Sequence, residues 1–200
     1  NESIARAKGS LIAPLGSDDV MLSERIATQV AYMEGKPEVG ICAGNIQTID
    51  AQGNLIQKRC RARPFSRLNF NSMFNALEDG PPAPTLLFRR EALQAVGGFD
   101  PKIRLEDLQV ELKIAYAGYF IDVLSEVLAK YRVHGANTYK DRRFMVEQVM
   151  ATYACFSDHP DYPSACAKFL NSMVLKSARD DKQLSRELLR QLPVRFWNGR

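Results

Sequence analysis

Five side chains in this sequence have the chemistry of an active site, and they fall into three short stretches. Carboxylates bind divalent cations and take up protons, whereas a histidine can ligate a metal or contact a phosphate. Two of the stretches are adjacent acid pairs, and the third is a histidine followed by a glycine. The five residues are Asp18, Asp19, Glu106, Asp107 and His134.

The first acid pair, Asp18 and Asp19, follows the apolar run 11–15 and the short turn Gly16-Ser17. Ligands of open α/β sheets bind beyond the carboxyl ends of the strands, where this pair is expected to lie. Two neighbouring anions repel each other, and Mg²⁺ or Mn²⁺ would remove that repulsion and bridge to a diphosphate. The dipeptide alone leaves another interpretation open, in which one aspartate caps the next helix or faces water.

The second pair, Glu106 and Asp107, falls at the start of a helix expected over 106–117. The helix macrodipole favours ionised carboxylates there, and a general base must be ionised and within reach of its proton. Ordinary stabilisation of the helix end is the alternative. His134 follows an expected strand and precedes Gly135, a position that suits a metal or phosphate contact but equally a satisfied polar group.

Composition places the chain among ordinary globular proteins. It has 200 residues, of which 46% are hydrophobic and 25% charged, and a net charge of +4. Neither a membrane-spanning run nor the apolar part of a signal peptide is present in the sequence. The four cysteines form no CxxC pair, which favours a reducing, cytoplasmic location over a disulfide framework or zinc site.

Hydrophobic periodicity and glycine or proline stops predict an α/β chain with a mixed sheet and flanking helices, followed by a helical tail. In the helix at 23–34, Ser23 is the expected N-cap, and Ile26, Val30 and Met33 share one face. A turn at 51–54 and a loop-like region at 57–82 with a short helix are also expected. Strands are predicted at 10–15, 39–50, 85–88, 119–123 and 127–133, and helices at 2–8, 23–34, 67–77, 89–96, 106–117, 140–157, 164–178 and 181–191.

Four segments in order resemble a known family. They are ARAKGSLIAPLGSDDVMLSERI, PPAPTLLFRREALQAVGGFDP, LEDLQVELKIAYAG and EVLAKYRVHGANT. Together they look like the back two-thirds of a family 2 inverting glycosyltransferase of the GT-A fold, a Rossmann-like nucleotide-diphospho-sugar transferase. The resemblance implies that residues 1–138 form a partial catalytic domain lacking its N-terminal nucleotide-binding part. Residues 139–200 are then a helical C-terminal extension.

The resemblance also implies roles for individual residues. Asp18 falls on the metal-binding aspartate, whose cation is Mg²⁺ or Mn²⁺, and Asp19 and His134 fall on the diphosphate side. Asp107 falls on the base that deprotonates the acceptor. The residues implied on the acceptor side are Glu106, Thr85, Phe88 and Gly98. Gly16 stands where the family often has an acid.

Such a family transfers a sugar from a nucleotide-diphosphate donor to an acceptor hydroxyl by one displacement with inversion. The expected acceptor is a glycan or lipid-linked glycan, and the expected setting is polysaccharide or lipopolysaccharide-type synthesis. The family's front portion, which recognises the nucleotide base, is not in this sequence. We therefore expect this chain alone to bind sugar nucleotides poorly and to turn over little.

A basic cluster, defined as Lys58, Arg59, Arg61, Arg63 and Arg67, contains no acid. It is either a solvated loop or a surface attracted to an anionic membrane, which would make the protein peripheral at the inner face of the membrane. Nucleic acid is not expected as a partner, because no aromatic residue interleaves the cluster before Phe65. A homodimer through the helical tail is a further expectation.

Two other functions stay open at the level of sequence. The chain is a non-catalytic interaction or dimerisation module derived from a glycosyltransferase, an interpretation that Gly16 favours. Alternatively, it belongs to a sugar nucleotidyltransferase, a class that also uses paired acids and Mg²⁺ but needs a glycine-rich phosphate loop, which this sequence does not contain.

Overall fold

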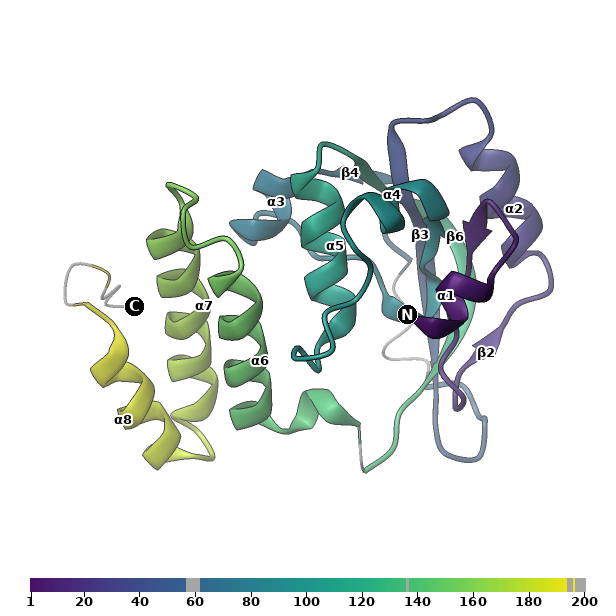
Figure 1. Cartoon of the computed structure of the whole chain (residues 1–200). Coiled ribbons are helices and arrows are strands. Elements are labelled where there is room, and N and C mark those ends of the chain that lie inside the picture. The colour runs from purple at the N-terminus through teal and green to yellow at the C-terminus, as the bar shows by residue number, and fades with distance from the viewer. Residues whose placement is uncertain (57–61, 136, 194–195, 197–200) are drawn as a thin grey trace.

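The protein is described here by a computed structural model, which describes residues 1–56, 62–135, 137–193 and 196. Two long parallel strands, β3 (Val39–Ile49) and β6 (Phe120–Arg132), form the centre of a mixed sheet. The strand order is β1-β5-β3-β6-β2, and β4 pairs with β6 beside this path. Helices cover both faces of the sheet, and three further helices stand to one side of it (Figure 1).

Strand β6 is continuous where two strands were predicted, at 119–123 and 127–133. Its pairing with β3 steps from Ala43–Val123 to Asn45–Val127, so the residues between the two predicted strands lie in a bulge. The Asn45 amide donates to the carbonyls of Leu124 and Ser125, which satisfies bulged backbone groups that the ladder leaves unpaired.

The opening strand is shorter and less buried than predicted. β1 (Leu11–Ile12) is a half-buried strand at the edge of the described sheet, antiparallel to β5 (Leu87–Arg89). Pairing stops before Pro14, which lacks a backbone N–H. Two short strands were not predicted, namely β2 (Val20–Met21) and β4 (Ser66–Leu68), both antiparallel to β6.

One face of the sheet is covered by α2 (Arg25–Met33), whose Met33 packs with residues of β3, β5 and β6. The opposite face holds the main hydrophobic cluster and is covered by α3 (Phe70–Phe74), α4 (Arg90–Ala95) and α5 (Glu106–Tyr116). Gly97 and Gly118 follow α4 and α5 with φ of +74° and +95°, which confirms the predicted glycine stops. The chain begins with α1 (Glu2–Arg6).

The prediction for the start of α2 was wrong, and its buried face is largely polar. Its N-cap position is Glu24 rather than Ser23, and no side chain caps it. Its buried face consists of Arg25, Gln29 and Met33, whereas Val30 is 43% exposed. Arg25 and Gln29 are polar but can be buried here, because they bond to backbone carbonyls of other segments.

The tail contains the three predicted helices, α6 (Arg142–Ala154), α7 (Tyr162–Ser177) and α8 (Lys182–Gln191). Asp141 and Asp181 cap α6 and α8 through their carboxylates. The main hydrophobic cluster extends into α6 and α7. The division of the chain into a catalytic part and a helical extension at residue 138 stays a prediction. Helices in the described part of the chain are all too short or too polar to cross a membrane.

Candidate active site

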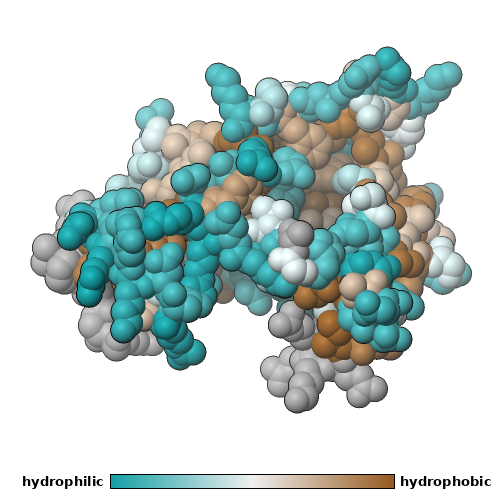
Figure 2. Space-filling model, turned by 90° about the horizontal axis from the view of Figure 1, so that it is seen from below, coloured by the Kyte–Doolittle hydropathy of each residue, from teal (hydrophilic) through white to brown (hydrophobic). Residues whose placement is uncertain are grey.

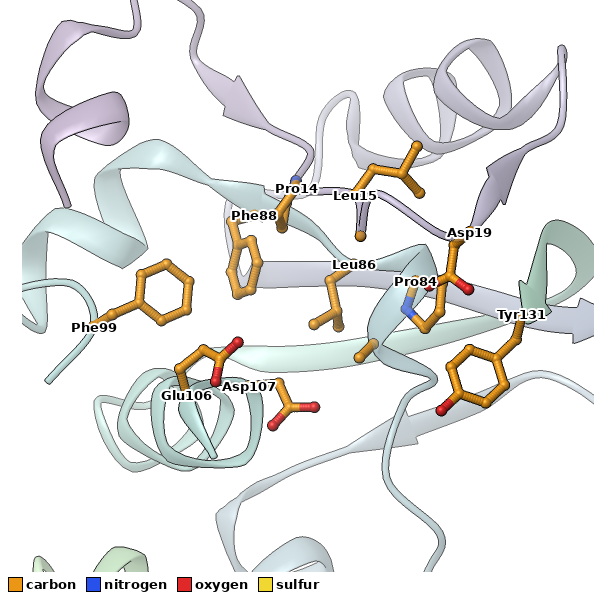
Figure 3. A pocket seen from close by; sticks show the side chains of 12 residues that line it. Pro14, Leu15, Asp19, Pro84, Leu86, Phe88, Phe99, Glu106, Asp107 and Tyr131 are labelled. Carbon is orange, nitrogen blue, oxygen red and sulfur yellow. The ribbon is translucent and has the colours of Figure 1, made fainter. Parts of the chain in front are cut away.

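Two neighbouring hollows share a wall formed by Glu106, Asp107 and Tyr131. The first hollow, of about 320 Å³, is drawn in Figure 3. The second hollow is about 480 Å³. The first is otherwise lined by Pro14, Leu15, Gly16, Asp19, Ala83, Pro84, Leu86, Phe88 and Phe99. The second is otherwise lined by Asp18, Leu105, His134, Asn137, Thr138, Tyr139 and Met145.

The turn that carries Asp18 and Asp19 is fastened to the end of β6. The Asp19 carboxylate accepts a hydrogen bond from the backbone N–H of Arg132 at 2.9 Å, and the Arg132 Nε donates to the carbonyl of Asp18 at 2.8 Å. Arg132 also donates to the carbonyls of Asp50 and Ala51 in the turn after β3. Three segments far apart in sequence therefore fix the position of the two carboxylates.

Asp18 faces His134 in the second hollow. The His134 Nε2 and the Asp18 Oδ2 are 3.0 Å apart, and this hydrogen bond is the main reason why the pKa of Asp18 is lowered. The loop that carries His134 is held by Asn137 and Lys140. The Asn137 side chain accepts from the His134 backbone N–H, and Lys140 donates to the His134 carbonyl. Asp18 is thus an ionised carboxylate beside an imidazole at an open surface.

Asp19 lies on the other side of the turn, in the first hollow. It is half-buried, and burial raises its pKa, while the hydrogen bond from Arg132 acts in the opposite direction. The predicted pair is therefore split between two environments, with Asp18 in the second hollow and Asp19 in the first.

Glu106 and Asp107 stand in the first turn of α5, as predicted, and face both hollows. Figure 3 shows both carboxylates directed toward the space beneath Phe88 and Leu86. Burial raises the pKa of Asp107, and the nearby charge of Glu106 raises it further, against a hydrogen bond from the Leu108 N–H at 2.7 Å. A carboxylate with a raised pKa is a stronger proton acceptor than an ordinary one, which suits a general base.

Of the other predicted acceptor residues, Phe88 lines the first hollow, whereas Thr85 and Gly98 line neither. Thr85 is fully buried, and its hydroxyl donates toward the carbonyls of Pro82 and Gly44. Gly98 is buried at φ +68°, and its carbonyl accepts from Lys113. Their positions support neighbouring residues rather than offering contact with a ligand in either hollow.

The sequence did not single out Tyr131 or Asn137, whereas Phe99 ends the segment 85–99 that the resemblance assigns to the acceptor side. Phe99 packs at right angles to Phe88, with the ring centroids 6.0 Å apart, and closes one end of the first hollow. Tyr131 and Asn137 flank His134 in the quoted stretch YRVHGANT, and their side chains are 3.3 Å apart. Proximity to His134 was the only available sign of their role.

The described side chains supply only part of the set of ligands that a divalent cation needs at this site. No group of three histidine, cysteine or acidic side chains suited to a metal occurs among the described residues, but Asp18 and His134 form a close pair of possible donors. Mg²⁺ characteristically binds one or two carboxylates and completes its shell with water and substrate phosphates. Among the described residues, those that line the two hollows include no lysine or arginine, so a cation would help to hold a diphosphate there.

Known proteins with similar sequences are glycosyltransferases. An amylovoran biosynthesis glycosyltransferase of Erwinia amylovora is 26% identical over 72% of this chain and 52% of its own length. An O-antigen biosynthesis glycosyltransferase of Escherichia coli is 28% identical over 78% of this chain and 58% of its own length. The chain thus spans about half the length of these curated relatives. No protein-family model matches it.

Solved structures with a similar fold are also glycosyltransferases. A mannosyltransferase of Pyrobaculum calidifontis matches with a TM-score of 0.56 at 15% identity, over 98% of this chain and 59% of that one. TarS of S. aureus matches with a TM-score of 0.65 at 14% identity, over 98% of this chain and 36% of that one. The predicted mixed α/β fold of the GT-A type is confirmed, and the chain is related to glycosyltransferases in both sequence and fold.

Proposed function

We propose that this chain carries the metal, diphosphate and acceptor side of an inverting family 2 glycosyltransferase. One observation carries the proposal: Asp18 and His134 lie across a shared space from Glu106 and Asp107. The close pair of Asp18 and His134 and the raised pKa of Asp107 support a cation on one side of this space and a base on the other.

In this mechanism, Asp107 takes the proton of the acceptor hydroxyl as its oxygen attacks the anomeric carbon. The bond from that carbon to the donor diphosphate breaks in the same step, so the configuration inverts and no protein nucleophile is needed. Glu106 orients the acceptor, and Phe88 and Phe99 form an apolar wall against it. Mg²⁺ or Mn²⁺ held by Asp18 and His134 would stabilise the charge that develops on the leaving diphosphate.

The compared proteins support the substrate classes. The P. calidifontis enzyme was solved with GDP-Man and Mn²⁺, and TarS was solved with UDP, which supports a nucleotide-sugar donor here. The names of the curated relatives refer to amylovoran and O-antigen biosynthesis, which supports a glycan acceptor in polysaccharide synthesis.

The test uses the full-length protein with Asp18→Ala and Asp107→Asn. We expect Asp107→Asn to lower kcat by roughly 10²–10⁴-fold, because it removes the base while keeping the shape of the side chain. Asp18→Ala should require roughly tenfold more Mn²⁺, seen both in activity and in the Mn²⁺ signal of electron paramagnetic resonance with a nucleoside diphosphate present.

The matched control is Asp79→Asn, since Asp79 is 90% exposed and lines neither hollow. Full activity in all three variants would contradict the assigned roles. Inversion is checked by the anomeric configuration of the product, measured by NMR.

The non-catalytic alternative has one observation in its favour. A Cβ at Gly16 would lie 3.1 Å from an oxygen of Asp18 and 3.2 Å from an oxygen of Asp19, so an acid at this position would crowd the pair. Glycine relieves that crowding but removes a carboxylate that the family often has. Absence of turnover by the unmodified full-length protein across a panel of sugar nucleotides would favour this alternative.

The remaining expectations concern partners and location. In the basic cluster, Lys58, Arg59 and Arg61 lie outside the described residues, while Arg63 and Arg67 bond within the chain. The lower ends of the tail helices are mainly hydrophilic (Figure 2), although Leu175 is 57% exposed. Membrane contact at the cytoplasmic face, dimerisation and weak donor binding by this chain alone stay predictions.

A further inference from the structure

A buried polar network lies beneath the first hollow, and its members Arg25 and Gln29 belong to no predicted site. It joins α2 to the segment 82–86, here called the floor segment, which includes the turn η2 (Ala83–Thr85). Ala83, Pro84 and Leu86 of this segment line the first hollow. Arg25, Gln29 and Thr85 are each 0% exposed, so the network is shielded from water.

Gln29 joins strand β3 to the floor segment. Its Nε2 donates to the carbonyls of Thr85 and Cys42, each at 2.7 Å. Its Oε1 accepts from the Arg25 Nε at 3.0 Å. A buried amide that uses both its donors and its acceptor fixes the groups around it, because breaking any bond leaves a buried polar atom unpaired.

Arg25 holds the next residue of the floor segment. Its Nη2 donates to the Leu86 carbonyl at 2.8 Å, and no carboxylate in the described part of the chain pairs with it. Burial lowers the pKa of this guanidinium, which shows how costly its position is. A rigid planar fork that bonds Gln29 and Leu86 at once is what arginine supplies there and lysine or methionine cannot.

The network also connects the two sides of the site. Helix α2 begins six residues after Asp19, and the floor segment leads directly into β5 with Phe88. The carbonyls of Thr85 and Leu86 are therefore held from the helix that follows the aspartate turn. Ala83, Pro84 and Leu86 line the same hollow as Asp107, so an acceptor bound there would touch both the floor segment and this carboxylate.

We propose that Arg25 and Gln29 are positioning residues: by holding the Thr85 and Leu86 carbonyls, they set the floor of the first hollow and hence the placement of the acceptor against Asp107. The role in acceptor placement rests on the proposed function, whereas the holding of the floor segment does not.

The test compares Arg25→Met and Gln29→Leu with Arg89→Met. Arg89 is the control, because like Arg25 it is an arginine that donates to backbone carbonyls of other segments, here Val39, Met33 and Lys36. It lines neither hollow. Arg25→Lys keeps the charge without the fork. It serves as the conservative variant that remains informative if a larger change prevents folding.

The first measurement is hydrogen exchange at the Thr85 and Leu86 amides, which donate to Pro82 and Ala83 in the floor segment. We expect exchange there to be roughly tenfold faster in Arg25→Met and Gln29→Leu, relative to the amide of Ala117 at the end of α5 as the internal reference. Arg89→Met should leave the ratio unchanged, and Arg25→Lys should fall between.

The second measurement is steady-state kinetics of the full-length protein. The two variants should raise the acceptor KM roughly tenfold and leave the donor KM within about twofold, as expected for a misplaced acceptor surface. Equal changes in both KM values, or the same changes in Arg89→Met, would overturn the positioning role. If Asp107→Asn keeps its activity while the exchange ratio changes as expected, the proposed function fails but the hold on the floor segment stands.

Discussion

At the scale of single residues, three aspartates of the candidate site differ in acidity because their surroundings differ. A hydrogen bond with His134 lowers the pKa of Asp18, whereas burial raises the pKa of Asp19 and Asp107. The exposed carboxylate suits a permanent charge beside a cation, and the half-buried one on α5 suits reversible protonation. The division of roles proposed above follows these environments.

The raised pKa of Asp107 predicts the acid limb of the reaction. A base is lost when it takes up a proton, so kcat/KM should fall with decreasing pH around a value above the ordinary aspartate pKa of 3.8. In Glu106→Gln the acid limb of the kcat/KM profile should move to lower pH, because the substitution removes a neighbouring negative charge that raises the pKa of Asp107. The profile of kcat/KM against pH measures both. An acid limb at the same pH in both proteins would show that Asp107 is not the titrating group.

Glu111 offers a prediction about stability. It is 4% exposed on α5, and burial, with a further contribution from the charge of Asp107, raises its pKa well above 4.5. The folded state therefore binds this proton more tightly than the unfolded state, so stability is lost as pH rises from 4.5 toward the folded-state pKa. Glu111→Gln should raise the free energy of unfolding at neutral pH by about 1 kcal/mol or more.

Urea unfolding at acidic and neutral pH measures this difference. The gain should shrink at acidic pH, where both proteins are neutral at this position. Glu91→Gln, at an exposed position on α4, is the control and should change little at either pH. A gain of equal size at both pH values would point to packing rather than to ionisation.

At the scale of elements, one buried carboxylate fastens β4 and α2 to the centre of the sheet. Asp122 of β6 is 0% exposed and accepts two hydrogen bonds from Arg67, at 2.8 and 2.7 Å, and one from the Tyr32 hydroxyl at 2.8 Å. The Arg67 guanidinium also stacks on the Phe120 ring at 4.8 Å. This pairing raises the pKa of Arg67 and makes it a structural residue.

Asp122→Asn should cost about 3 kcal/mol of stability, because a bidentate pair is broken and a cation loses its buried partner. Asp79→Asn is the matched control: the Asp79–Arg63 distance is 3.6 Å and Asp79 is 90% exposed, so its loss should change stability by less than about 1 kcal/mol. Thermal and urea unfolding of the two variants give the comparison. Similar losses in both would mean that the pair at Asp122 does not anchor β4.

At the scale of the whole molecule, the helical tail shares its core with the sheet layer. Phe74 of α3 contacts the rings of Tyr153 and Phe156, with centroid distances of 5.0 and 5.7 Å. Ala165 and Cys166 of α7 belong to the same cluster. Aromatic contacts of this kind contribute beyond their buried area, so the two parts are coupled energetically.

A chain ending at residue 138 should therefore fail to unfold cooperatively and should bind a hydrophobic dye such as ANS. Its main cluster would lose Tyr153 and Phe156 and would expose Phe74. Circular dichroism during heating and dye fluorescence measure this. A cooperative transition in the shortened chain would instead support residues 1–138 as a separate domain.

Much of the element pattern could be predicted from the sequence. Hydrophobic periodicity and glycine stops located α4, α5 and the three tail helices, because these signals act within a few residues. The acid pairs and His134 stood out for the same reason: carboxylates at a strand end or helix start are visible as local spacing. The family resemblance assigned Asp18 and His134 to the same metal and diphosphate side, whereas their separation of 3.0 Å became known only from the tertiary structure.

The sequence by itself determined the types of element and the residues able to bind a cation or take up a proton. The tertiary structure decided which of them share a space, and it placed Phe99 and Tyr131 in the site and Thr85 beneath it. It also turned Arg25 and Gln29 inward, against the expected apolar face of α2. The physical reason is that a buried polar side chain depends on its bonding partners, and the carbonyls that hold these two residues come from segments 13 to 61 residues away.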